Sequence, residues 1–112
     1  MTLTHIVSFR YAETVDLATR QSVFERFLDL RSLCKLQDGS AYIADVIAGN
    51  ANISPEGAGK GFDHTFIVTF NNADHVKHYL ETDAAHLDFV AFVKPLLVDA
   101  FIYDFHTQRA SA

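Results

Sequence analysis

The sequence contains one cysteine, no tryptophan and few basic residues, and these shortages exclude several classes of protein. Because Cys34 is alone among 112 residues, neither an internal disulfide nor a cysteine-rich tetrahedral metal site can form. We expect Cys34 to be a small buried side chain of a helix. The formal net charge is −5, and the nine lysines and arginines are scattered. Sequence-independent binding to nucleic acid needs basic residues that displace counterions, so we expect no nucleic acid partner.

Long hydrophobic runs are also absent. No stretch approaches the roughly 20 apolar residues that cross a bilayer. Residues 1–13 lack the basic start and apolar centre of a signal peptide. We therefore expect a cytoplasmic protein with no membrane partner.

Apolar residues make up 49% of the chain and include ten phenylalanines, so one domain over residues 1–112 can bury a core rich in phenyl rings. Their spacing alternates between the period of strands and the period of helices. We predict strands over 2–11, 41–49, 61–70 and 99–106, and helices over 14–36, 71–80 and 84–97. The glycine-rich residues 50–61 form a loop long enough to act as a lid. The tail, residues 107–112, is expected to fray.

Polar residues and a proline mark the ends of the predicted helices. Glu13 or Thr14 is expected near the start of the first helix. Asn72 and Asp83 are expected N-caps of the later helices. Pro95 is expected to bend or end the last helix, because proline lacks the backbone N–H that a helix interior needs.

The predicted order β-α-β-β-α-α-β is that of a ferredoxin-like α+β domain with an antiparallel sheet and a doubled second crossover. In this architecture the helices cover one face of the sheet and leave the other face bare. The bare face is predicted to carry residues of mixed polarity, namely Ile6, Ser8, Arg10, Thr65, Ile67 and Thr69. Such a face can pack against a copy of itself and retain some water, so a homodimer is favoured.

The covered face is predicted to carry histidines among its apolar residues. In "GFDHTFIVTF" (61–70), His64 shares a face with two phenylalanines and a valine, and His5 begins a similar set in the first strand. Tyr79 and His86 lie on the apolar stripes of the last two helices, so these four residues could converge on one apolar space. Burial there would lower the pKa of a histidine and leave it able to accept a proton near pH 7. A phenol can hydrogen-bond a carbonyl oxygen that gains charge.

Each of these residues also has a structural interpretation. His5 and His64 could simply hydrogen-bond the neighbouring backbone, and Tyr79 could be a core aromatic. His86 could pair with Asp83 or Asp88. Whether the rings of His5 and His64 approach each other depends on strand register, which the sequence does not fix.

The remaining histidines are expected outside this site. His75 and His78 lie off the apolar stripe and are expected in solvent. Their spacing permits a shared metal ion, but no carboxylate pattern accompanies them, so a metal site is disfavoured. His106 is expected near a sheet edge.

Four segments resemble the stress-responsive dimeric α/β-barrel (Dabb) family: "THIVSFRY", "GFDHTFIVTF", "HYLETDAAH" and "FIYDF". The resemblance spans His5 to Phe105. It implies a ferredoxin-like monomer whose sheet pairs with that of a second copy to form a barrel. The family includes stress-induced proteins and a plant olivetolic acid cyclase, which closes a polyketide by an aldol reaction without a metal or organic cofactor. By this resemblance we expect no cofactor.

The similarity to the cyclase also implies roles for four residues. His86 would be the general base and Tyr79 the hydrogen-bond donor, while His5 and His64 would shape or polarise the pocket. The chain departs from the family pattern at "DAAH", where the family often has His-Pro-Ala-His. Asp83 therefore stands in place of a histidine, where it could orient His86 or cap the helix.

A second departure concerns the first helix, where Phe27 or a neighbour stands in place of a tyrosine of the cyclase.

Three functions follow as hypotheses. The first is a homodimer that binds a small apolar, carbonyl-bearing molecule between sheet and helices. The second is a cofactor-independent cyclase, isomerase or lyase with a histidine base, and the third is a structural, stress-protective protein without a ligand site.

Overall fold

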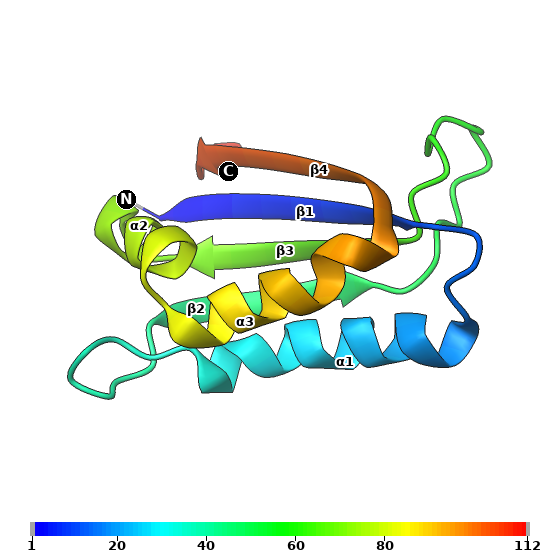
Figure 1. The fold of residues 1–112 in the computed structure, drawn as a ribbon. Helices are drawn as coiled ribbons and strands as arrows, with labels where there is room; N and C mark the ends of the chain where they lie inside the picture. The colour runs from blue at the N-terminus through cyan, green and yellow to red at the C-terminus, as the bar shows by residue number, and fades with distance from the viewer. Residues whose placement is uncertain (1, 112) are drawn as a thin grey trace.

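The computed structural model describes residues 2–111, and its elements follow the predicted order. They are β1 (Leu3–Tyr11), α1 (Leu17–Leu33), β2 (Ile43–Gly49), β3 (His64–Phe70), α2 (Ala73–Glu81), α3 (Ala84–Val93), a 3₁₀ turn (Lys94–Leu96) and β4 (Leu97–His106). The strands form one sheet in the order β2-β3-β1-β4, and each neighbouring pair is antiparallel. This is the predicted ferredoxin-like α+β arrangement, with α2 and α3 together forming the second crossover (Figure 1).

The helix ends agree with the predicted caps in two cases and differ in one. Asn72 caps α2 and Asp83 caps α3, each through a side-chain oxygen that accepts backbone N–H groups. The first helix is shorter than predicted, because Asp16, and not Glu13 or Thr14, accepts the N–H of Thr19. Its helical course ends at Cys34, whose backbone is extended.

Pro95 has the predicted effect on the last helix. The α-helical hydrogen bonds stop at Val93, and Pro95 lies in the 3₁₀ turn that leads into β4. Proline is tolerated there because the first turn of a helix leaves its N–H groups without intrahelical partners.

The three helices cover one face of the sheet, and phenyl rings fill the space between the layers (Figure 1). Phe27 of α1 stacks on Phe66 of β3 with ring centroids 3.8 Å apart. The buried stripe of α1 is narrow, since the first and last residues of the helix, Leu17 and Leu33, are 83% and 59% exposed. Val23, Phe27 and Leu30 form the stripe.

The opposite face has no helix over it. Ser8 and Thr65 hydrogen-bond each other there at 2.9 Å, in agreement with the predicted mixed polarity. Strand register adds apolar residues that the prediction omitted, because cross-strand partners in an antiparallel sheet point to the same side. They are Ile47, which is the cross-strand partner of Ile67, and a ladder of three neighbouring aromatic rings along the edge strand β4, formed by Phe101, Tyr103 and Phe105.

Candidate functional site

Strand register separates the two histidines of the sheet. Val68 is the cross-strand partner of His5, and Phe9 is the partner of His64. His5 and His64 therefore share the helix-covered face but lie four residues apart along the strands, about 13 Å. The expected convergence of four residues is wrong for His64, for a reason that only register could decide.

His64 instead has protein partners on both ring nitrogens. The hydroxyl of Tyr11 donates to Nδ1 at 2.9 Å, and Nε2–H donates to the side-chain oxygen of Asn50 at 3.1 Å. This assignment follows because the Asn50 oxygen can only accept. Burial lowers the pKa of His64. The ring of His64 therefore has a structural role, although its partners are the side chains of Tyr11 and Asn50 and not the neighbouring backbone that was expected.

The other three predicted residues line one cavity. It has a volume of about 350 Å³ and lies between β1 and β4 on one side and α2 and α3 on the other. His5, Tyr79 and His86 meet at one end of it, with the rings of His5 and Tyr79 6.0 Å apart. The rest of the wall is mainly apolar and includes Val7, Phe27, Phe89, Val90, Ala100 and Ile102.

His86 is held by Tyr79 in two ways. Its Nδ1–H donates to the backbone carbonyl of Tyr79 at 2.8 Å, and its ring stacks on the Tyr79 ring with centroids 3.7 Å apart. Because a carbonyl can only accept, the proton lies on Nδ1 and the lone pair on Nε2. Burial lowers the pKa of His86, while the Tyr79 carbonyl acts in the opposite direction. The geometry thus gives a neutral imidazole with a free proton acceptor.

His5 has a carboxylate partner that sequence reasoning missed. Its Nδ1 hydrogen-bonds Asp104, which is its cross-strand partner on β4. His5 is 3% exposed, and Asp104 lies at the more open edge of the sheet. Nε2 is the remaining polar atom of the ring. The alternation in "FIYDFH" places Asp104 on the same face as Ile102, and a carboxylate at such a position could have been noticed.

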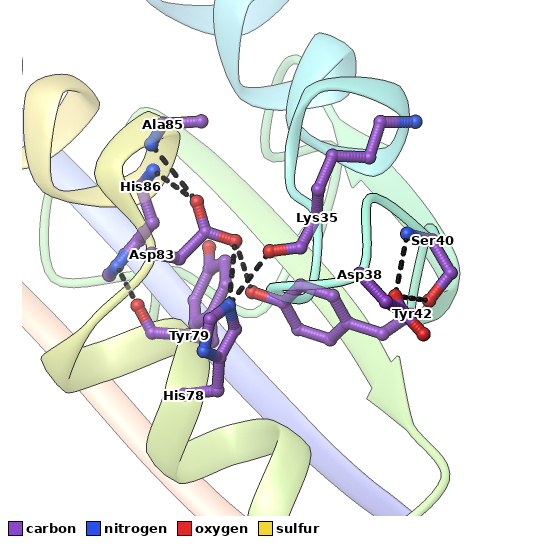
Figure 2. A network of polar contacts seen from close by, with 9 residues as sticks. All are labelled: Lys35, Asp38, Ser40, Tyr42, His78, Tyr79, Asp83, Ala85 and His86. Carbon is purple, nitrogen blue, oxygen red and sulfur yellow. Dashed lines mark hydrogen bonds and ion pairs between the residues drawn. The ribbon is translucent and has the colours of Figure 1, made fainter.

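Tyr79 contributes its ring to the cavity. The residue is 1% exposed, and Figure 2 shows the hydroxyl end of its ring directed toward Asp83. Burial raises the pKa of Tyr79, and the nearby Cys34 and Asp83 act in the same direction. The phenol is therefore neutral, and its hydroxyl faces the interior behind the cavity wall.

Asp83 lies at the centre of a buried polar network behind His86 (Figure 2). One of its oxygens accepts from the backbone N–H groups of Ala85 and His86, and the other accepts from the hydroxyl of Tyr42 at 2.6 Å. Asp83 thus caps α3 and does not bond the His86 ring. The ring of His78 lies beside this network. Its Nε2 donates to the carbonyl of Lys35 at 2.8 Å and lies 3.6 Å from an oxygen of Asp83.

Two of the remaining histidine predictions are wrong and one is consistent with the structure. His75 and His78 pack edge-on against Tyr42 and are partly buried, because the segment after α1 folds back over α2. His106 lies exposed at the end of the edge strand β4, as predicted.

Cys34 is fully buried beside this network, as predicted, but it directly follows α1 in an extended conformation and does not lie within the helix. Burial raises the pKa of its thiol to about 12, and the negative charge of Asp83 adds to the effect. A thiol with such a pKa is protonated near pH 7 and is a poor nucleophile.

Residues 2–111 contain no group of three or more His, Cys, Asp or Glu side chains arranged to hold a metal ion. Within the same residues, no helix has the length and apolar character needed to cross a membrane.

Comparisons with known proteins agree with this architecture. Residues 3–107 match the family model described as Stress responsive A/B Barrel Domain (Dabb). A solved structure from Arabidopsis thaliana is similar at 18% identity and a TM-score of 0.83, over 98% of this chain and 99% of that chain. A hydroxynitrile lyase from Passiflora edulis is similar at 18% identity and a TM-score of 0.78, over 99% and 97%.

A dimeric ferredoxin-like protein of unknown function from Thermobifida fusca is similar at 20% identity and a TM-score of 0.75, over 96% of this chain and 92% of that chain. At these identities the likeness to solved structures shows the fold alone. No curated protein matches the sequence.

The first prediction concerns the protonation of His86. We expect ¹⁵N-edited NMR to find the Nδ1–H tautomer at pH 7 and a pKa below the ordinary 6.5, because burial disfavours the imidazolium. The ring should therefore gain its second proton only as the pH falls below the usual range. A dominant Nε2–H tautomer would contradict the hydrogen bond to Tyr79.

Proposed function

The chain belongs to the stress-responsive A/B barrel domain (Dabb) family, and from this premise we propose that it binds a small apolar, carbonyl-bearing molecule in the cavity between the sheet and α2 and α3. The observation that carries the proposal is the composition of the wall. It is apolar along most of its length and has two imidazoles, His5 and His86, at one end. Ligand sites commonly combine an apolar lining with a few convergent polar groups.

The two imidazoles define what the ligand must offer. The Nε2 lone pair of His86 can accept a proton, either from a hydroxyl or from a carbon made acidic by a neighbouring carbonyl. His5 is oriented by Asp104, and when protonated at both nitrogens it can donate from Nε2 to a carbonyl oxygen. A compact β-dicarbonyl with an apolar substituent meets both requirements and gains from burial of its apolar part.

The second prediction tests the cavity with 1-phenylbutane-1,3-dione as probe. We expect saturable binding by isothermal titration calorimetry, and a Kd at least about tenfold higher for Ala100→Trp, whose indole would fill the space. Ala91→Trp is the matched control, because Ala91 lies on the exposed side of α3 and outside the cavity. Equal affinity in the two variants, or no binding by the unmodified protein, would favour the structural, stress-protective alternative.

A second function is favoured by the free lone pair of His86. In a cofactor-independent lyase, isomerase or cyclase, His86 would take a proton from the carbon next to a carbonyl. The electron pair of the broken C–H bond would form the C=C bond of an enolate, the π pair of the carbonyl would move to its oxygen, and protonated His5 would stabilise that oxygen. In this scheme Tyr79 acts by holding His86, since its hydroxyl is directed toward Asp83.

The third prediction tests this base. In D₂O the protein should accelerate deuterium exchange at the central carbon of the same diketone, followed by ¹H NMR. His86→Gln should lower the protein-dependent rate by roughly 10²-fold or more, because general bases contribute that much. The rate should also fall as the pH drops through the lowered pKa of His86, since imidazolium cannot accept a proton.

His106→Ala is the matched control for that experiment, because it removes an exposed imidazole that does not line the cavity. Exchange that survives in folded His86→Gln would remove His86 from the mechanism and leave the binding proposal in place.

We also propose that the protein is a homodimer that joins through the helix-free face of the sheet. This face carries the Phe101–Tyr103–Phe105 ladder, whose members are 38–57% exposed. Aromatic side chains of this kind are enriched in protein interfaces. The same face leaves the buried Nε of Arg10 without a hydrogen-bond partner in the part of the chain that the structure describes, and a second copy can supply one.

The fourth prediction concerns this interface. Tyr103→Glu should convert the dimer into a monomer at micromolar concentration, because a carboxylate in the middle of the Phe101–Tyr103–Phe105 ladder would be buried in the interface without a partner. Analytical ultracentrifugation gives the mass. Leu17→Glu, at an exposed position of α1, should leave the dimer intact. A monomeric unmodified protein would overturn the assembly proposal.

A further inference from the structure

We propose that Asp83 is a positioning residue for His86, and that Tyr42 holds Asp83 in place for this task. The inference rests on the proposed function, because it concerns the residue that the cavity offers to a ligand. Asp83 itself lies behind the cavity wall and does not bond the His86 ring (Figure 2).

The backbone contacts of Asp83 fix the start of α3. Its side-chain oxygen Oδ1 accepts from the N–H groups of Ala85 at 2.9 Å and His86 at 3.4 Å. Its own N–H donates to the carbonyl of His78 at 2.8 Å, which ties α3 to the end of α2. Because His86 must reach back to the carbonyl of Tyr79 on α2, the geometry of this junction decides where the imidazole lies.

Helix capping alone does not explain why Asp83 is buried. Asp16 and Asn72 also cap helices in this chain, and both are exposed, as the usual polar N-cap is. Asp83 is 4% exposed. Its second oxygen accepts from Tyr42, which is itself buried, and the Nε2 of His78 lies 3.6 Å from the same oxygen.

A buried carboxylate is costly unless its oxygens are bonded, so the chain stabilises this one with donors from two separate segments. They are the segment before β2, which supplies the hydroxyl of Tyr42, and the first turn of α3, which supplies two backbone N–H groups, while the ring of His78 on α2 lies 3.6 Å away. The carboxylate therefore locks the elements on which the cavity end is built.

The charge of Asp83 also acts on His86. Three titratable residues surround the ring, namely His5 of β1, Tyr79 of α2 and Asp83. Asp104 of β4 lies behind His5, and Lys94 lines the same cavity. Burial and His5 disfavour the imidazolium form of His86, whereas Asp83 favours it. When His86 takes a proton from a ligand, the negative charge of Asp83 stabilises the cation that forms.

The fifth prediction separates charge from capping by comparing Asp83→Asn with Asp83→Ala. Asparagine keeps the cap and removes the charge, so the pKa of His86 should fall while the contacts of its ring with Tyr79 persist. Alanine removes both, so the NMR contacts with Tyr79 should weaken and the Nδ1–H tautomer should lose its dominance. Asp88→Asn, at an exposed position of the same helix, should change neither property.

The proposal is overturned if His86 titrates in Asp83→Asn as in the unmodified protein, and this outcome decides the matter even if Asp83→Ala does not fold. An equal effect of Asp88→Asn would also overturn it, because general net charge would then suffice. These NMR readouts need no ligand. If the unmodified protein fails to bind the diketone, the proposed function falls, and the assignment of Asp83 is still judged by the behaviour of the His86 ring.

Discussion

The hydrogen-bond register of β1 with its two neighbours determines most of what this protein can do. It pairs His5 with Asp104 on one side and with Val68 on the other. A shift of one residue would turn every side chain of β1 to the opposite face. His5 would then leave the cavity, and the phenyl core would lose Phe9. The cavity end, the core and the bare face are therefore consequences of the same set of backbone hydrogen bonds.

The interior separates two kinds of polar group. Behind the cavity wall, Asp83 accepts from the hydroxyl of Tyr42 and from backbone N–H groups, and the hydroxyl end of Tyr79 is directed toward it. At the wall itself, His5 and His86 each hydrogen-bond a protein group through Nδ1, which leaves Nε2 available to a ligand. Buried polar atoms are normally satisfied within the fold. The two Nε2 atoms, of His5 and His86, distinguish this end of the cavity from an ordinary core.

The departure from the family pattern at "DAAH" has a physical meaning in this arrangement. A carboxylate at position 83 can accept two backbone N–H groups and a phenol at once, which a neutral histidine cannot do. The chain thereby gains a buried negative charge close to His86. Burial lowers the pKa of His86, and the negative charge of Asp83 acts in the opposite direction.

Periodicity and local chemistry in the sequence determined the element order, the covered and bare faces, the caps at Asn72 and Asp83, and the helix end near Pro95. They also placed Tyr79 and His86 on inward stripes, because these properties depend on residues close together in the chain. Only the tertiary structure decided that His64 lies away from His5, that Asp104 is the partner of His5, and that Tyr42 reaches Asp83. Each of these depends on strand register or on how distant segments pack, and the pattern of apolar residues is nearly the same for several such arrangements.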